Sequence, residues 1–209
     1  MKPIIIINFK TYKQGKKVVD LAKKIEKVSK DIIIGVQAND IYEVAKATKL
    51  KVFSEHVDYF KPGKYTGYII PEAIKKDKAV GSFLNHSEHK LKFDVLVKSI
   101  KRCKEVKLKT AVFAKDLKQA KKIEKLKPDF LIYEPPELVG GKVSVSNAKP
   151  GVISKIKKNL KCKFLVGAGI KNNEDVKTAI KLGASGIAVS SGVVNARDPE
   201  GKLRGLLER

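Results

Sequence analysis

Short apolar segments alternate with longer amphipathic segments along almost the whole chain. The apolar segments are rich in β-branched residues, and continuous runs of this kind are typical of parallel strands that are buried on both faces. The pattern predicts eight strands, at residues 3–9, 31–36, 50–54, 79–84, 108–113, 129–134, 162–167 and 186–190.

Helical patterns follow these strands. The clearest are at residues 14–29, 91–106, 116–126, 147–159 and 173–182. After the third strand, Pro62, Gly63, Gly67 and Pro71 leave room only for a loop and a short helix. Eight βα units in about 200 residues are near the lower limit for a closed (β/α)8 barrel, whereas an open doubly wound sheet needs fewer strands. The sequence therefore predicts an α/β protein, with one closed barrel domain over residues 1–209 and no interdomain linker.

The composition adds an unusually basic charge. The 45 Lys and Arg residues exceed the 22 Asp and Glu residues, which gives a formal net charge of +23. Nearly all of the positive charge is lysine, on the polar faces of the predicted helices. Sites that read nucleic acid favour arginine, and single-strand binding sites also use aromatic residues between the basic ones. We therefore expect a solvated basic surface and no specific nucleic-acid partner.

No apolar stretch is long enough to be a signal sequence or to span a bilayer. The two cysteines, Cys103 and Cys162, form neither a disulfide framework nor a metal-binding spacing. We expect a cytoplasmic protein with reduced thiols and no contact with membranes.

The candidate chemistry lies where the predicted strands end, which is where barrels of this kind place their active sites. Asn8 and Lys10 end the first strand, and the strand period of two predicts that Lys10 points into the barrel mouth. His86 follows the fourth strand; an adjacent helix N-terminus would favour its neutral imidazole. Glu134 ends the sixth strand before Pro135 and Pro136, which would fix its carboxylate as a general base.

Other interpretations of these residues are less specific. Glu134 could be an ordinary charged residue before a proline turn, and Lys10 one of many surface lysines. His86 and His89 could suggest a metal, but zinc sites need three or four ligands and no further cluster accompanies them. We therefore expect neither a metal nor an organic cofactor, and we expect His56 to be packed at the end of the third strand.

Small residues follow the last two predicted strands, as Gly167-Ala168-Gly169 and Ser190-Ser191-Gly192. Such residues expose backbone N–H groups at helix starts, which suits phosphate binding. Tight turns would explain the glycines equally well in isolation. Their position after the seventh and eighth strands favours a phosphate site.

Five segments together resemble the triosephosphate isomerase family, and over nearly the whole chain the resemblance is to its short archaeal form. The segments are Asn8-Phe9-Lys10-Thr11-Tyr12, Asn85-His86-Ser87-Glu88-His89, Tyr133-Glu134-Pro135-Pro136-Glu137-Leu138-Val139-Gly140, Val145-Ser146-Asn147-Ala148-Lys149-Pro150 and Gly167-Ala168-Gly169-Ile170. The resemblance implies a TIM barrel that interconverts dihydroxyacetone phosphate and D-glyceraldehyde 3-phosphate through an enediolate, in glycolysis and gluconeogenesis.

The resemblance also implies a role for each matching residue. These are Glu134 as base, His86 as electrophile, Asn8 and Lys10 as the substrate-binding pair, Val139 and Gly140 as the lid backbone over the phosphate, Gly169, Ser190 and Ser191 as the fixed half of the phosphate site, and Glu88 in support. It further implies a homodimer or homotetramer, with Thr66 in a loop that reaches the neighbouring subunit. Gly141-Lys142 departs from the usual Thr-Gly of the archaeal lid, which would alter lid kinetics or phosphate affinity.

Two other functions compete with this interpretation. A different phosphate-binding barrel, similar to indole-glycerol phosphate synthase or an aldolase, would share the ends of strands seven and eight but would not require His86 together with Glu134-Pro135-Pro136. A basic nucleic-acid-binding protein would differ by keeping its affinity at physiological salt.

Overall fold

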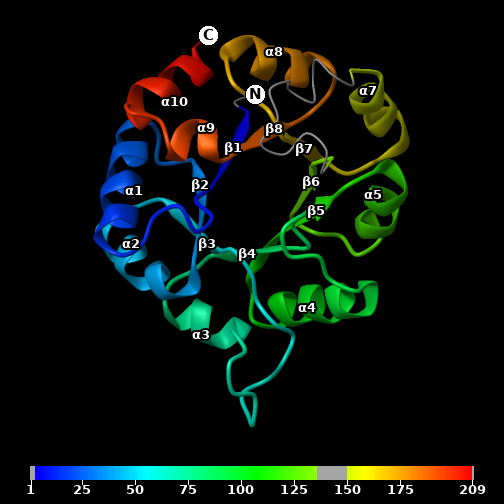
Figure 1. The fold of residues 1–209 in the computed structure, drawn as a ribbon. Helices are drawn as coiled ribbons and strands as arrows, with labels where there is room; N and C mark the ends of the chain where they lie inside the picture. The colour runs from blue at the N-terminus through cyan, green and yellow to red at the C-terminus, as the bar shows by residue number, and fades with distance from the viewer. Residues whose placement is uncertain (1–2, 136–149, 209) are drawn as a thin grey trace.

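Eight parallel strands form a closed barrel in chain order, and the last strand pairs with the first (Figure 1). The computed structural model describes residues 3–135 and 150–208. The strands are β1 (Ile4–Asn8), β2 (Ile33–Val36), β3 (Lys51–Ser54), β4 (Gly81–Leu84), β5 (Lys109–Ala114), β6 (Phe130–Tyr133), β7 (Phe164–Gly167) and β8 (Gly186–Val189). The predicted closed barrel is thus confirmed, and each predicted strand end agrees to within two residues.

Helices surround the barrel as an outer ring (Figure 1). They are α1 (Lys16–Val28), the 3-10 turn η1 (Ala38–Asp40), α2 (Ile41–Ala47), α3 (Pro71–Lys76), α4 (Phe93–Glu105), α5 (Leu117–Glu124), α7 (Pro150–Asn159), α8 (Asn173–Lys181), α9 (Ser191–Val194) and α10 (Pro199–Leu207). The short α3 is the one expected after the third strand. Of the helix predicted at 147–159, residues 147–149 lie outside the described part of the chain.

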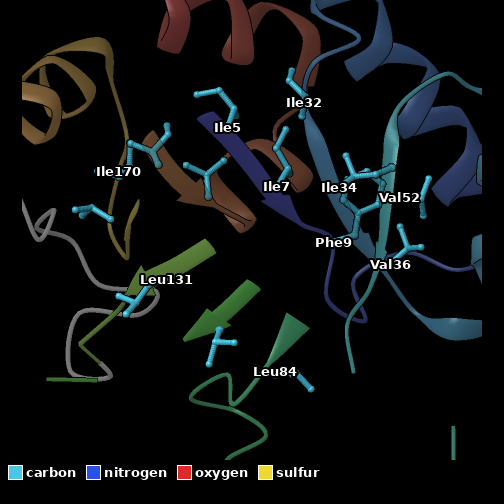
Figure 2. Packing of buried hydrophobic residues seen from close by; sticks show 14 of the residues in the cluster. Ile5, Ile7, Phe9, Ile32, Ile34, Val36, Val52, Leu84, Leu131 and Ile170 are labelled. Carbon is cyan, nitrogen blue, oxygen red and sulfur yellow. The ribbon is translucent and has the colours of Figure 1, made fainter. Parts of the chain in front are cut away.

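Alternate residues of each strand contribute to two hydrophobic layers. Ile5 and Ile7 belong to the layer between the sheet and the helices, whereas Ile6 belongs to the cluster inside the barrel. Figure 2 shows the outer layer, in which Ile5, Ile7 and Ile34 belong to neighbouring strands. Because both faces of every strand are covered, the strands read as continuous apolar runs rather than alternating ones.

Aromatic rings fill the inside of the barrel. Phe53 lies 5.8 Å from Phe83, and Phe83 lies 5.7 Å from Phe113, measured between ring centroids. Glycines on the adjoining strands leave the necessary space, because a Cβ at Gly35 would overlap the ring of Phe83 and a Cβ at Gly81 would overlap that of Phe53. The barrel is therefore a packed core, and its open chemistry is confined to the strand ends.

Within the described residues, no helix combines the length and the apolar character needed to cross a membrane. Both cysteines are free thiols. Burial raises the pKa of Cys103 to about 12 and that of Cys162 to about 11, so neither thiol is activated at neutral pH.

Candidate active site

Glu134 and His86 form a contact at the carboxyl end of the barrel. Glu134 follows β6 directly, and its backbone N–H donates to Ala114 on β5, so the carboxylate is held by the sheet itself. Its Oε2 lies 3.1 Å from Nε2 of His86, which follows β4. The Glu134 residue is 9% exposed and His86 is 8% exposed. Two strand ends thus bring together the carboxylate and the imidazole, each of which was expected at the end of a strand.

The orientation of the His86 ring follows from its other nitrogen. The Glu88 backbone N–H donates to Nδ1 of His86 at 3.2 Å. A ring nitrogen that accepts a hydrogen bond carries no proton, so this contact assigns the proton of the neutral ring to Nε2, which faces Glu134. The prediction that a helix N-terminus beside His86 favours its neutral imidazole was wrong, however. Helix α4 begins only at Phe93, and a turn rather than a helix N-terminus follows His86.

Lys10 reaches the same site, but not through strand alternation. Strand β1 ends at Asn8, and Lys10 lies in a turn with a left-handed φ of 47°. The carboxamide Oδ1 of Asn8 accepts the Lys10 backbone N–H at 3.0 Å and stabilises this turn. The prediction that strand alternation points Lys10 into the barrel mouth was therefore wrong, because Lys10 lies beyond the end of strand β1.

The ammonium of Lys10 is paired with Glu88. Its Nζ lies 2.5 Å from Glu88 Oε1, and the lysine side chain is only 15% exposed. Glu88 therefore contacts both predicted binding and catalytic groups, with its carboxylate on Lys10 and its backbone N–H on His86. The supporting role expected for Glu88 has a geometric basis.

Gly167 and Ser87 complete the surroundings of the Glu134 carboxylate. A Cβ at Gly167, the last residue of β7, would lie 2.8 Å from Glu134 Oε1 and 3.3 Å from Glu134 Cγ. The hydroxyl of Ser87 donates to Glu134 Oε2 at 3.5 Å. Neither residue was expected to contact Glu134 from the sequence alone. For Gly167, the available signal was a glycine that ends an apolar strand next to the base.

Asn85 holds the loop that carries His86. Its φ is 61°, its amide donates to the Phe113 carbonyl at 2.8 Å, and its Oδ1 accepts from the Leu91 backbone at 3.1 Å. Asparagine tolerates the left-handed region better than most residues. Asn85 had no assigned role in the sequence interpretation, although it begins the motif around His86.

The loops after β7 and β8 lie against each other. Ala168 and Gly169 both have positive φ angles, 77° and 71°, and a Cβ at Gly192 would lie 3.8 Å from the Ile170 carbonyl. Ser190 directly precedes α9, which begins at Ser191. The predicted phosphate residues Gly169 and Ser190 are thus in adjoining loops, and Ser191 is the first residue of α9. Val139 and Gly140 lie outside the described residues, as does Gly141-Lys142.

Glu55 is a further carboxyl group at this end of the barrel, and the sequence interpretation missed it. It follows β3, and burial raises its pKa to about 7. His86 and a backbone hydrogen bond from Lys10 oppose that rise, whereas Glu88 and Asp40 add to it. A glutamate after an apolar strand gave no distinctive signal in a chain with 22 acidic residues.

The remaining histidines pack against each other. His56 and His89 stack with ring centroids 4.2 Å apart, and burial, followed by His89, lowers the pKa of His56. His56 is therefore packed at the end of β3, as predicted. His86 and His89 point to different partners, and no cluster of three or more His, Cys, Asp or Glu residues within 3–135 and 150–208 could hold a metal ion.

A cavity of about 1120 Å³ lies at the end of the barrel opposite to Glu134 and His86. Its lining includes Ile4, Ile33, Phe53 and Lys109, from the beginnings and interiors of strands. The described acid–base groups Glu134, His86 and Lys10 do not line it. The candidate active site is therefore assigned to the carboxyl end, where this architecture places its chemistry.

The fold and these side chains define the class of (β/α)8-barrel enzymes with acid–base groups at the strand ends. A family model described as triosephosphate isomerase matches residues 3–122 and 107–204. The chain therefore belongs to the triosephosphate isomerase family.

Curated archaeal relatives cover almost all of the chain. The triosephosphate isomerase of Saccharolobus solfataricus is 44% identical over 208 residues, which are 95% of this chain and 92% of the relative. That of Sulfolobus acidocaldarius is 42% identical, covering 95% and 90% respectively. That of Methanosarcina mazei is 38% identical over 216 residues, covering 98% and 97%.

Proposed function

We propose that this chain interconverts dihydroxyacetone phosphate and D-glyceraldehyde 3-phosphate, with Glu134 as the base that moves a proton between the two reacting carbons. The observation that carries the proposal is the buried contact of 3.1 Å between the Glu134 carboxylate and His86 Nε2. A base held by the sheet and a donor held beside it are the parts that enolisation needs. General base catalysis of this kind contributes roughly 10²- to 10⁴-fold in rate.

His86 would polarise the substrate carbonyl through Nε2–H. In the free protein this proton faces Glu134 Oε2, so the substrate oxygen must replace the carboxylate at Nε2 while Glu134 turns to the neighbouring C–H. A donor already in place when the enediolate oxygen develops charge costs no reorganisation at that moment. Losing one such donor typically lowers kcat by about 10²- to 10³-fold.

Lys10 and Asn8 would bind the substrate. The Lys10 ammonium is largely buried beside Glu88, where its charge is less screened than on the surface. It can therefore attract both the phosphate dianion and the enediolate oxygen. Asn8 is 8% exposed and holds the turn that aims Lys10, so its contribution includes positioning.

The phosphate would lie at the adjoining loops after β7 and β8. The backbone of Gly169 and that of Ser190 and Ser191 are the candidate donors, in agreement with where such barrels bind phosphate. The roles of Val139 and Gly140, and any effect of Gly141-Lys142, rest on the family resemblance alone.

The reaction needs no electron acceptor, because an aldose and a ketose of the same formula differ only in the position of hydrogen. We therefore propose that these side chains act without an organic cofactor. We place the reaction in glycolysis and gluconeogenesis in the cytoplasm, where the two free thiols would remain reduced.

The test is turnover of glyceraldehyde 3-phosphate by purified, chelator-treated protein, followed as dihydroxyacetone phosphate in a coupled assay. The wild type should turn over rapidly, and Lys10→Met should raise KM and lower kcat, together by at least about 10²-fold in kcat/KM. Lys17→Met removes an exposed lysine of α1 and is the matched control. Wild-type kinetics in Lys10→Met would make Lys10 an ordinary surface lysine and contradict its role.

The chain is also proposed to form a homodimer or homotetramer through the loop between β3 and α3. This loop, residues 55–70, extends away from the barrel (Figure 1). It carries an aromatic cluster in which Phe60 lies 4.2 Å from Tyr65 and 4.5 Å from Tyr68, between ring centroids. Tyr65 is 43% exposed and Tyr68 is 52% exposed. Exposed aromatic side chains on a protruding loop are typical of protein interfaces, and Thr66 lies among them.

A further inference from the structure

Glu55 is a half-buried acid at the candidate site for which the proposed mechanism has no use. Its backbone N–H donates to Val36 at 3.0 Å, so it continues the β2–β3 ladder and stays at the carboxyl end of β3. Its carboxyl oxygen Oε1 is fully buried and has no hydrogen-bond partner. When the carboxylate is charged, the Lys10 backbone N–H donates to it, but Oε1 lacks a donor that would offset its lost hydration.

Burial raises the pKa of Glu55 most, and neighbouring groups act on it in both directions. Asp40 acts on it from η1, and Glu88 from the loop after β4. The opposing influences are His86 and the backbone hydrogen bond from Lys10, while the ammonium of Lys10 is paired with Glu88. The surroundings therefore leave Glu55 close to the balance between its neutral and ionised forms, with a pKa of about 7.

An anionic substrate would change that balance in one direction. A bound triose phosphate brings up to two negative charges at neutral pH, and it displaces water from the Lys10 and His86 groups that act on Glu55. Added negative charge and further desolvation both disfavour an ionised carboxylate. The pKa of Glu55 must then rise on binding, and by linkage its ionisation must oppose binding.

We propose that Glu55 is a proton-linked residue of the substrate site: its carboxyl is neutral when the anionic substrate is bound, and its ionisation above neutral pH weakens binding. This inference rests on the proposed function, which supplies the triose phosphate as ligand. The direction in which binding changes with pH follows from the raised pKa of Glu55 in the folded protein. The neutral, binding-competent form dominates below about pH 7 and is lost as the pH rises through that value.

The direct test is titration calorimetry with dihydroxyacetone phosphate at pH 7.5, in two buffers of different ionisation enthalpy, which reports the protons taken up per ligand bound. Glu55→Gln mimics the neutral carboxyl and cannot titrate. The wild type should take up about three-quarters of a proton more per ligand than Glu55→Gln, because about that fraction of a carboxyl with a pKa of about 7 is ionised at pH 7.5 before binding. The phosphate group contributes equally to both proteins, so the difference belongs to Glu55. Glu43→Gln, which removes an exposed carboxyl on α2, should behave like the wild type.

Steady-state kinetics provide a second readout that a merely structural role would not move. The ratio of wild-type KM to Glu55→Gln KM should rise about 25-fold between pH 6.5 and 8.5, while the ratio of the kcat values changes little with pH. Equal proton uptake with a flat KM ratio would overturn the inference. Weaker binding by Glu55→Gln at every pH would also overturn it, because the ionised form would then be the required one.

Calorimetry separates this inference from the proposed function. Proton-linked binding without turnover would overturn the proposed reaction and support the role of Glu55. Turnover without the difference in proton uptake would support the proposed reaction and overturn the role of Glu55. Absence of binding by both proteins would overturn the two together.

Discussion

At the scale of single residues, the candidate site depends on space as much as on chemistry. Glu134 reaches His86 because Gly167 on the neighbouring strand has no side chain, and His86 faces Glu134 because the Glu88 backbone occupies its other nitrogen. A carboxylate with the right strand position but a larger neighbour would be displaced from its partner. The position of the base therefore depends on neighbouring strand ends as well as on Glu134 itself.

Gly167→Ala should reduce kcat by about 10²-fold. The new Cβ would lie 2.8 Å from Glu134 Oε1, so the carboxylate must shift, and a displacement of about 1 Å in a catalytic group can cost that much. The measurement is kcat in the coupled assay. Gly151→Ala on α7 is the control, because a Cβ there would meet no atom within 4 Å. Equal activity of the two variants would show that Gly167 does not position the base.

Residue identities at the site could be predicted better than the geometry that brings them together. Asn8 ends a strand, and His86 and Glu134 follow strands. These strand ends are visible in the sequence, so the shared location of the three residues was predictable. Lys10 reaches the site through a left-handed turn, which strand periodicity does not describe. Glu55 could not be predicted, because its unusual environment arises only when three neighbouring loops meet around it.

At the scale of elements, the barrel interior depends on aromatic rings opposite glycines. Phe53, Phe83 and Phe113 lie on three consecutive strands, and Gly35 and Gly81 leave room for two of the rings. The strands themselves were predictable because burial on both faces gives continuous apolar runs. Which side chains point inward, and which glycine faces which ring, depends on the register that barrel closure imposes.

Phe83→Ala should destabilise the protein by about 3–5 kcal/mol, because it leaves a cavity in the barrel interior where Phe83 is 1% exposed. Phe93→Ala should cost less than about 1 kcal/mol, because Phe93 is 45% exposed at the start of α4. Urea unfolding of both variants measures the two free energies. Similar losses in the two would contradict the packed-interior description.

At the scale of the whole molecule, the candidate site and the proposed subunit interface both involve the loop after β3. The candidate site gathers loops from several strands at the carboxyl end, whereas the aromatic cluster lies on the loop at 55–70 that extends beyond the ring of helices (Figure 1). Both are connected through β3, which ends in Ser54 just before Glu55 and His56. Assembly through this loop would therefore brace the strand end that carries Glu55.

Light scattering after size-exclusion chromatography should give the wild type a mass of two or four times 23.1 kDa. The double variant Tyr65→Ser and Tyr68→Ser should shift this mass toward the monomer, because it removes exposed aromatic area from the proposed interface. Tyr42→Ser is the control, since Tyr42 is similarly exposed, at 44%, but lies on α2. A monomeric wild type, or an oligomer indifferent to the double variant, would contradict the proposed interface.

We propose Glu134 as the base, and the kcat of Glu134→Asp tests this role. The substitution keeps the carboxylate but withdraws it by one methylene from His86 and from the substrate. We expect kcat to fall by about 10²- to 10⁴-fold while KM changes little, because the interaction lost is one made in the transition state. A variant that turns over triose phosphates at the wild-type rate would contradict the assignment of the base.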